Sequence, residues 1–425
     1  MSDTPSPHPR RSLLSALAPG ILVAATGVGA GDLITAGLAG SRLGVVVAWT
    51  AIAGAILKYA LNEGVARWQM ATGATLLEGW TDKLGAWIRW VFLAYLLVWS
   101  LFTGGALVSA CGVAGYGLFS PNTDPETARI VWGIAHSLVG AALVFLGGYR
   151  LFEKLMAVFI AVMFVAVIAT AVLIRPDWSA VGAGLLKPTI PDADNALKYV
   201  LGIIGGVGGT VTLLCYGYWI REEGRSGESG VKACRLDLAI GYAMTAMFGV
   251  AMIVIGQRVT LTQGGARMAP LLASQLADVI GPAGRWIFLI GFWGAVFSSL
   301  LGVWQSVPYL FADFVHMKRR RDDGERDAEI DFTKTKAYRG FLISLATLPL
   351  VFLKLKVETI QLAYAVLGAL FMPLLALTLI LMNNRRAWVG HRFRNGLLTN
   401  ALLAATLVFF GAIGVQTILK ELGTP

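Results

Sequence analysis

The chain has 425 residues, of which 56% are hydrophobic and only 14% carry a charge, and its mean hydropathy is +0.68. These values exclude a water-soluble globular protein and indicate an integral membrane protein in a lipid bilayer. The net charge of +10 does not require a nucleic-acid partner, because membrane proteins collect Lys and Arg in their cytoplasmic loops. We expect one transmembrane domain over residues 1–425 and no nucleic-acid partner.

Eleven apolar segments of about the length that crosses a bilayer follow one another along the chain. The predicted spans are 17–40, 44–66, 86–116, 130–147, 152–174, 198–220, 236–256, 285–314, 339–353, 358–382 and 396–419, of which the ninth is short. If the N-terminus is cytoplasmic, 23 of the 35 Lys and Arg residues lie on the cytoplasmic side, 11 lie on the other side, and Lys58 lies inside a span. The charge asymmetry and the odd number of spans predict a multi-pass protein of the plasma (inner) membrane, with its N-terminus in the cytoplasm and its C-terminus outside.

The first span contains "ATGVGAGDLITA" at 25–36, which places the carboxylate of Asp32 beside three glycines. A glycine inside a helix costs about 1 kcal/mol relative to alanine, and a carboxylate at membrane depth costs roughly 2.5 to 3.5 kcal/mol. The sixth span repeats the crowding of glycines in "LGIIGGVGGTVTLLCYGYWI" at 201–220. Two glycine-interrupted spans at corresponding places are typical of inverted-repeat transporters, whose broken helices bind the substrate near the midplane of the membrane.

Five spans lie in each half of the chain, and an odd number of crossings turns the second half upside down. We therefore expect an all-α membrane fold with a first five-helix repeat at 17–174, a second, inverted repeat at 198–382 and an eleventh helix at 396–419.

The glycines alone leave a second interpretation open. Gly27 with Gly31, and Gly205 with Gly209, also match the small-xxx-small pattern that lets membrane helices pack closely. Asp32 favours a substrate or ion site, because an acid at membrane depth normally faces a pathway or a partner.

The ligands available near the two predicted breaks are all oxygen atoms. They are the Asp32 carboxylate, the hydroxyls of Thr212 and Thr210, and the backbone carbonyls that unwinding would free at Thr26, Gly29 and Gly209. Such ligands suit hard dications such as magnesium, calcium and manganese.

Three further residues are candidates for lining the site or for a gate. Lys58 and Asn62 lie four residues apart on the second span, where snorkelling to the membrane surface or a local ion pair is the alternative. Tyr216 follows the break in the sixth span, where aromatic packing is the alternative.

Four stretches of the chain together resemble one known family. They are "RWQMATGATLLEGW" at 67–80, "RPDWSAVGAGLL" at 175–186, "GAVFSSLLGVW" at 294–304 and "WVGHRFRN" at 388–395. These stretches are similar to the Nramp family of divalent-metal transporters. The resemblance implies a LeuT-like inverted repeat of 5+5 transmembrane helices plus an eleventh helix, with the metal ion between the unwound parts of the first and sixth helices.

The two ligand motifs of the family are altered in this chain. Where the family usually reads Asp-Pro-Gly-Asn, matching on "AGSRLG" gives "GAGD", with Gly29 in the aspartate position and Asp32 in the asparagine position. Where the family usually reads Met-Pro-His, matching on "GGTV" gives Thr212, Leu213 and Leu214. The sulfur and imidazole ligands that the resemblance implies are therefore replaced, which leaves a site of oxygen atoms.

Proton-coupled members of the family carry the histidine of the sixth helix and acids on the third helix. Here the histidine position is Leu214, and the third span contains no Asp, Glu or His. We therefore predict transport of hard dications such as magnesium or manganese by alternating access, without obligatory proton coupling.

No motif indicates an enzyme or a bound cofactor, since the chain has no H-E-x-x-H, no Walker motif and no nucleotide-binding glycine loop after a strand. The divalent ion is expected as substrate. A cation-coupled carrier for a small organic solute such as an amino acid is the alternative function, because the same fold hosts both. A membrane sensor that binds a ligand without moving it is a third possibility.

Overall fold

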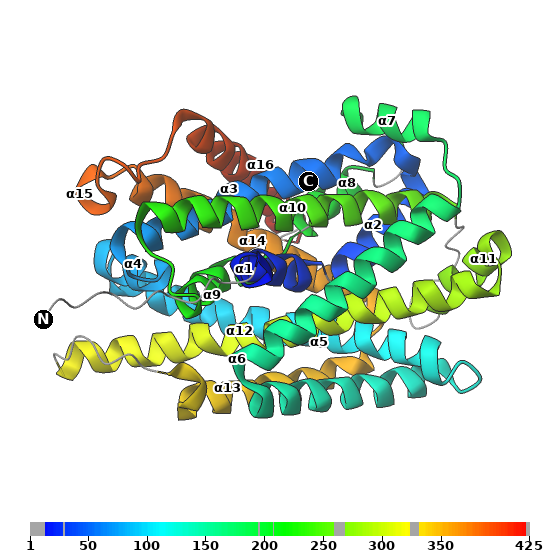
Figure 1. The fold of residues 1–425 in the computed structure, drawn as a ribbon, viewed down its shortest axis with the longest axis horizontal. Helices are drawn as coiled ribbons and strands as arrows, with labels where there is room; N and C mark the ends of the chain where they lie inside the picture. The colour runs from blue at the N-terminus through cyan, green and yellow to red at the C-terminus, as the bar shows by residue number, and fades with distance from the viewer. Residues whose placement is uncertain are drawn as a thin grey trace, which may run out of the picture.

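The computed structural model describes residues 13–28, 30–193, 196–206, 208–258, 268–323 and 331–421, and all regular structure in these residues is helical. Figure 1 shows a bundle in which most of the long helices run along the long axis of the molecule. Short helices lie at its two ends, with α4 and α15 at one end and α7 and α11 at the other.

The elements follow one another in a simple order along the chain. They are α1 (Leu13–Gly27), α2 (Ala30–Leu43), η1 (Gly44–Val47), α3 (Trp49–Thr72), α4 (Leu76–Lys83), α5 (Ala86–Phe119), α6 (Pro125–Leu173), α7 (Trp178–Leu186), α8 (Ala196–Gly206), η2 (Val211–Leu214), α9 (Cys215–Glu222), α10 (Gly227–Gln257), α11 (Met268–Ile280), α12 (Pro282–Asp323), η4 (Phe332–Lys334), α13 (Lys336–Thr347), η5 (Leu348–Lys354), α14 (Val357–Asn383), α15 (Arg386–Val389) and α16 (Leu397–Glu421).

Each of the eleven predicted spans has a helical counterpart. Eight helices of the described residues are long and apolar enough to cross a membrane, or nine if the bent pair Thr35–Val47 and Trp49–Thr72, which meet at 102°, counts as one span. The count is below eleven because α1 and α2 have only 15 and 14 residues, and because the apolar described part of α16 is the shorter segment Leu397–Ala412.

The fourth and fifth predicted spans lie in one helical element, α6. It contains two apolar segments of crossing length, Pro125–Gly147 and Leu151–Leu173. Figure 1 shows that α6 is bent between them, so that the two segments run in different directions. The helix begins at an N-cap, since the Asp124 carboxylate accepts a hydrogen bond from the Thr127 amide and Pro125 occupies the first turn.

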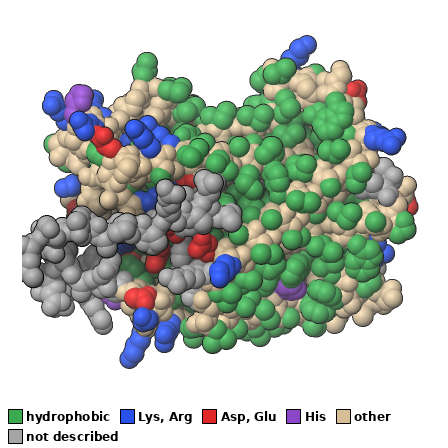
Figure 2. Space-filling view, in the orientation of Figure 1, with side chains coloured by type: hydrophobic (Ala, Val, Ile, Leu, Met, Phe, Trp, Pro, Cys, Tyr) green, Lys and Arg blue, Asp and Glu red, His purple; other side chains and the backbone are tan. Residues whose placement is uncertain are grey.

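The surface of the bundle is apolar along its middle. Figure 2 shows hydrophobic side chains covering the central part of this face, with Lys, Arg, Asp and Glu gathered towards its two ends. Large exposed apolar residues include Leu146, Val158 and Val165, of which Leu146 is 88% exposed. A continuous apolar zone between two charged ends is the surface that a protein needs in a bilayer.

Two helices form the centre of the bundle. α12 packs against α1, α5 and α6, and α10 packs against α1, α2 and α3. Fully buried α12 residues include Phe292, Leu300 and Trp304, and Trp304 Nε1 donates to the carbonyl of Ser137 on α6 at 3.3 Å. This packing holds α1 from both sides and fixes where its C-terminal end lies.

Candidate cation site between the broken helices

The breaks in the first and sixth spans touch each other. α1 ends at Gly27, and α8 ends just before Gly208 and Gly209, whose φ angles are +86° and +82°. A Cβ atom on Gly27 would lie 2.9 Å from the Cα atom of Gly208. The glycines therefore serve both interpretations of the sequence, since they break the helices and also let the two backbones make contact.

The carbonyls at the end of α1 are bonded by hydroxyls of α12. Ser298 Oγ donates to the carbonyl of Ala25 at 3.1 Å, and Ser299 Oγ lies 2.8 Å from the carbonyl of Val28 and 3.3 Å from that of Ala25. Side-chain hydroxyls commonly satisfy the backbone groups that a broken membrane helix frees. α12 thus holds the end of α1 in place.

A cavity of about 10 Å³ lies beside the two breaks. Its lining comes from α1, α5, the sixth-span break, α12 and α14, and consists of Thr26, Trp99, Thr103, Ala106, Leu107, Gly209, Thr212, Ser299, Val303, Gln361 and Tyr364. This volume is close to the minimum that holds one water molecule. Three of the predicted site residues, Thr26, Gly209 and Thr212, therefore line one cavity.

Three buried oxygen atoms of this lining have no hydrogen-bond partner within the described structure. They are Thr26 Oγ1, Thr103 Oγ1 and Gln361 Oε1. Gln361 uses its amide nitrogen, which donates to the carbonyl of Ala106 at 3.0 Å, so its oxygen remains as an acceptor. Buried polar atoms are normally satisfied by protein or water. The set is suited to a water molecule or a partly dehydrated cation.

Thr103 and Gln361 were not among the residues that the sequence predicted. Gln361 offered a signal, because it is an uncharged polar residue inside the apolar tenth span. Thr103 offered none, since a threonine hydroxyl within an apolar helix usually bonds its own backbone.

Lys58 lies at the break of the sixth span. Its side chain is fully buried, and its ammonium group donates to the carbonyl of Gly205 at 2.6 Å and also to the carbonyl of Gly209. The snorkelling alternative for Lys58 is therefore wrong, because the side chain does not reach a membrane surface. The Gly209 carbonyl, a predicted metal ligand, is in contact with a cation of the protein itself.

The other predicted neighbours of the site make separate contacts. Thr210 Oγ1 accepts a hydrogen bond from Trp99 Nε1 at 3.1 Å, which connects it to a cavity-lining residue. Asn62 Nδ2 donates to the hydroxyl of Tyr242 at 3.2 Å on α10. Tyr216 donates to Asp237 at 2.7 Å and does not line the cavity.

Gly29 and the side chain of Asp32 lie outside the described residues, so their predicted role stays a prediction. The backbone of Asp32 belongs to the first turn of α2, directly after the first break. Within the described part of the chain, no group of three or more His, Cys, Asp or Glu residues is arranged to hold a metal ion.

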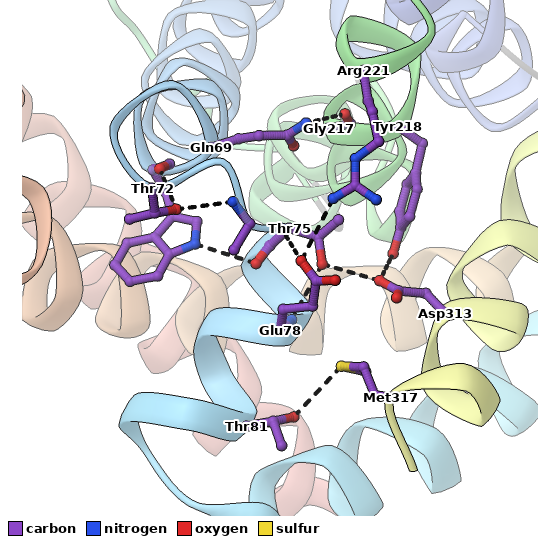
Figure 3. Close-up of polar contacts among 12 residues, drawn as sticks. Gln69, Thr72, Thr75, Glu78, Thr81, Gly217, Tyr218, Arg221, Asp313 and Met317 are labelled. Atoms are coloured by element: carbon purple, nitrogen blue, oxygen red, sulfur yellow. Dashed lines mark hydrogen bonds and ion pairs between the residues drawn. The ribbon is translucent and has the colours of Figure 1, made fainter. Parts of the chain in front are cut away.

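A second buried polar cluster joins α4, α9 and α12. The carboxylate of Asp313, which is fully buried, accepts hydrogen bonds from Tyr218 at 2.7 Å and from Thr75 Oγ1 at 3.0 Å. Thr75 also forms a capping box with Glu78 at the start of α4. Figure 3 shows Thr75 and Tyr218 both directed towards Asp313, and Glu78 beside Thr75. Arg221 reaches Glu78 at 3.5 Å. The cluster thus connects one end of the sixth span to α4 and α12.

The comparisons with known proteins cover most of the chain. The family model described as "Natural resistance-associated macrophage protein-like" (Nramp) matches residues 20–420. The chain is 24% identical over 296 residues to "Divalent metal cation transporter MntH" of Yersinia enterocolitica, which covers 66% of this chain and 70% of that protein.

Two solved structures show the same arrangement of helices. The manganese transporter of Eremococcus coleocola, in complex with an aromatic bis-isothiourea substituted compound, matches with a TM-score of 0.78 at 16% identity over 98% of this chain and 89% of that chain. MhsT in complex with L-phenylalanine matches with a TM-score of 0.54 at 16% identity over 97% of this chain and 99% of that chain. At these identities the likeness shows the fold alone.

Proposed function

Because the chain belongs to the Nramp family, whose model matches residues 20–420, we propose that it moves divalent metal ions across a membrane by alternating access. The observation that carries the proposal is the cavity beside the two touching breaks, with its three unpartnered buried oxygen atoms. The names of the similar proteins, a divalent metal cation transporter and a manganese transporter, support it.

The fold is the LeuT-like helical bundle of the family. In our proposal residues 17–174 and 198–382 are the two inverted five-helix repeats, and 396–419 is the added helix. The contact between Gly27 and Gly208 supports this division, because it joins the first span of each repeat. The charge asymmetry supports a cytoplasmic N-terminus and an external C-terminus in the plasma membrane.

The proposed ion is a hard dication such as manganese or magnesium. Asp32 supplies the negative charge, and Thr212, the carbonyls of Thr26, Gly29 and Gly209, and the newly found Thr103 and Gln361 supply neutral oxygens. Magnesium in particular keeps several of its waters when it binds, which compensates for a site with a single carboxylate. The described lining contains no sulfur and no imidazole, so it offers nothing that favours softer metals.

Transport in this proposal has no obligatory proton symport. His136, a histidine inside the membrane bundle, has both ring nitrogens occupied: Nε2 accepts from Trp293 at 2.8 Å, so Nδ1 carries the proton and donates to the carbonyl of Trp132 at 2.6 Å. Asp237 and Asp313 are buried but do not line the cavity. A proton path needs titratable groups or ordered water beside the ion.

The test is uptake of Mn²⁺ into proteoliposomes that contain a metal-quenched dye. Wild type should quench the dye, and Asp32→Ala and Asp32→Asn should both abolish quenching, while Asp82→Asn, a change of an exposed acid on α4, should leave it intact. Undiminished uptake in both Asp32 variants would overturn the assignment of Asp32.

The same vesicles distinguish metal transport from the alternative function, transport of an organic solute. If a mixture of amino acids abolishes a slow Mn²⁺ signal, or if labelled amino acid enters while Mn²⁺ does not, the chain is a carrier for an organic solute. Mn²⁺ uptake that ignores amino acids supports metal transport.

A further inference from the structure

The Lys58 side chain is the most unusual feature beside the cavity. It is a lysine within the bundle, its exposure is 0%, and its ammonium group bonds two carbonyls of the sixth span, those of Gly205 and Gly209. Gly205 belongs to the last turn of α8, and Gly209 lies in the break that follows. The lysine comes from α3, so the contact joins two separate helices.

The C-terminal end of a helix is a place where cations bind. Its last carbonyls lack helical partners, and the helix dipole places partial negative charge there. In transporters built from broken helices, such half-helix ends and unwound carbonyls bind the transported or coupled cations. The Lys58 ammonium occupies a position of this kind.

The stem of Lys58 packs beside Gly208 in the break of the sixth span. A Cβ atom on Gly208 would lie 3.5 Å from Cδ of Lys58 and 2.8 Å from a ring carbon of Tyr242. The distance to Cδ of Lys58 is an ordinary contact, so the lysine stem packs directly beside this left-handed glycine, and it is Tyr242 that a side chain at position 208 would meet too closely.

A purely structural link between α3 and the sixth span would not require a charge. Gln69, further along α3, makes such a link with a neutral amide, which donates to the carbonyl of Gly217 at 2.7 Å. A buried ammonium group is more costly than an amide and is kept only where its environment compensates it. The charge of Lys58 is therefore the property to explain.

Gly209 connects Lys58 to the cavity. The residue lines the cavity with Thr26, Thr103 and Gln361, and its carbonyl is bonded to Lys58. We propose that the Lys58 ammonium is a tethered cation that competes with the transported ion for the Gly209 carbonyl, so that the ion binds only when Lys58 leaves this carbonyl. This proposal rests on the proposed transport of divalent metal.

Two consequences follow from the competition. The positive charge of Lys58 lowers the affinity of the site for a dication, because the two cations repel each other across a few ångströms of protein. Lys58 also fills the end of α8 when the metal is absent, so the empty site does not leave two carbonyls without a donor.

The test measures Mn²⁺ binding to the purified full chain by calorimetry. Lys58→Met removes the charge and the hydrogen bonds, and Lys58→Gln removes the charge but keeps an amide donor. Both variants should bind Mn²⁺ at least about tenfold more tightly than wild type. The control Gln69→Met removes the neutral link between α3 and Gly217 and should leave the affinity unchanged.

The outcomes separate this proposal from the proposed function. If wild type binds Mn²⁺ and both folded Lys58 variants bind it equally or more weakly, the competition is overturned and metal transport stands. If a Lys58 variant binds Mn²⁺ and wild type shows no binding, the competition is supported, and Mn²⁺ uptake by wild type in proteoliposomes then decides whether metal transport stands. If no form binds Mn²⁺, both fail. Thermal unfolding of each variant establishes that it is folded.

Discussion

Two ion pairs in the chain have the same N···O distance of 2.6 Å but very different burial. The side chains of Arg225 and Asp237 are 7% and 0% exposed, whereas those of Arg129 and Glu126 are 2% and 59% exposed. Asp237 also accepts a hydrogen bond from Tyr216 at 2.7 Å. Distance alone would rank the two pairs equally, whereas burial predicts unequal effects when the acid is neutralised.

The expected magnitudes differ severalfold. Asp237→Asn keeps an acceptor for Tyr216 but removes the charge that compensates Arg225, and breaking a buried pair costs about 3–5 kcal/mol. Glu126→Gln changes a group in contact with solvent and costs about 0–1 kcal/mol. With an unfolding entropy of about 2.1 cal/mol/K per residue, the whole chain loses about 1 °C in Tm for each kcal/mol. We expect a fall of about 3–5 °C for Asp237→Asn and about 1 °C or less for Glu126→Gln.

The assay is thermal unfolding in detergent, followed by the fluorescence of the 13 tryptophans. The double variant Arg225→Met with Asp237→Asn should lose less Tm than Asp237→Asn alone, because it leaves no uncompensated buried charge. Equal shifts for Asp237→Asn and Glu126→Gln, or a double variant that is less stable than the single one, would refute the reasoning from burial.

Four further predictions concern transport, binding and topology. Gly209→Ala should abolish Mn²⁺ uptake, because a side chain at a left-handed φ of +82° costs roughly 1–2 kcal/mol and its Cβ atom would lie 2.5 Å from Thr212 Oγ1. The control Gly182→Ala, whose Cβ atom would have nothing within 4 Å, should not change uptake. Gln361→Leu should weaken Mn²⁺ binding about tenfold by removing one neutral oxygen, roughly 1.4 kcal/mol, and an unchanged calorimetric affinity would exclude this oxygen from the site. Reporter fusions should place the N-terminus in the cytoplasm and the C-terminus outside. Vesicles with an internal pH dye should show no acidification driven by a Mn²⁺ gradient.

The membrane helices were predictable because length and hydropathy determine them. The third predicted span, 86–116, corresponds to α5 (Ala86–Phe119), and the tenth, 358–382, to α14 (Val357–Asn383). The second predicted span ends too early, because α3 continues to Thr72. The helix runs through Glu63 and Arg67, which are polar but buried. Hydropathy cannot anticipate polar residues that pack against other helices.

The short helices outside the spans were not predicted. Only α4 had a clear signal, since Thr75 and Glu78 have the spacing of a capping box and form one. Asp177 likewise caps α7 by accepting from the amides of Ser179 and Ala180, but a single aspartate is too common in loops to indicate a helix. Short helices need tertiary contacts that a local pattern does not contain.

The candidate site was predictable in its backbone and less so in its side chains. The glycine clusters marked both breaks, and Thr26, Gly209 and Thr212, which were predicted beside these breaks, line one cavity. Gln361 comes from α14, and its approach to the breaks depends on how distant helices pack. The bond between Lys58 and Gly209 is likewise a long-range contact, across 151 positions of the chain.

The hydroxyl of Ser299 has one proton and two carbonyls within reach, those of Val28 at 2.8 Å and Ala25 at 3.3 Å. Rotation of the hydroxyl about its Cβ–Oγ bond can transfer the proton from one acceptor to the other without leaving it unbonded. Either of these two hydrogen bonds can therefore be lost without leaving the hydroxyl unbonded. The end of α1 is in this way bonded to α12 through one hydroxyl that can use either of two backbone carbonyls.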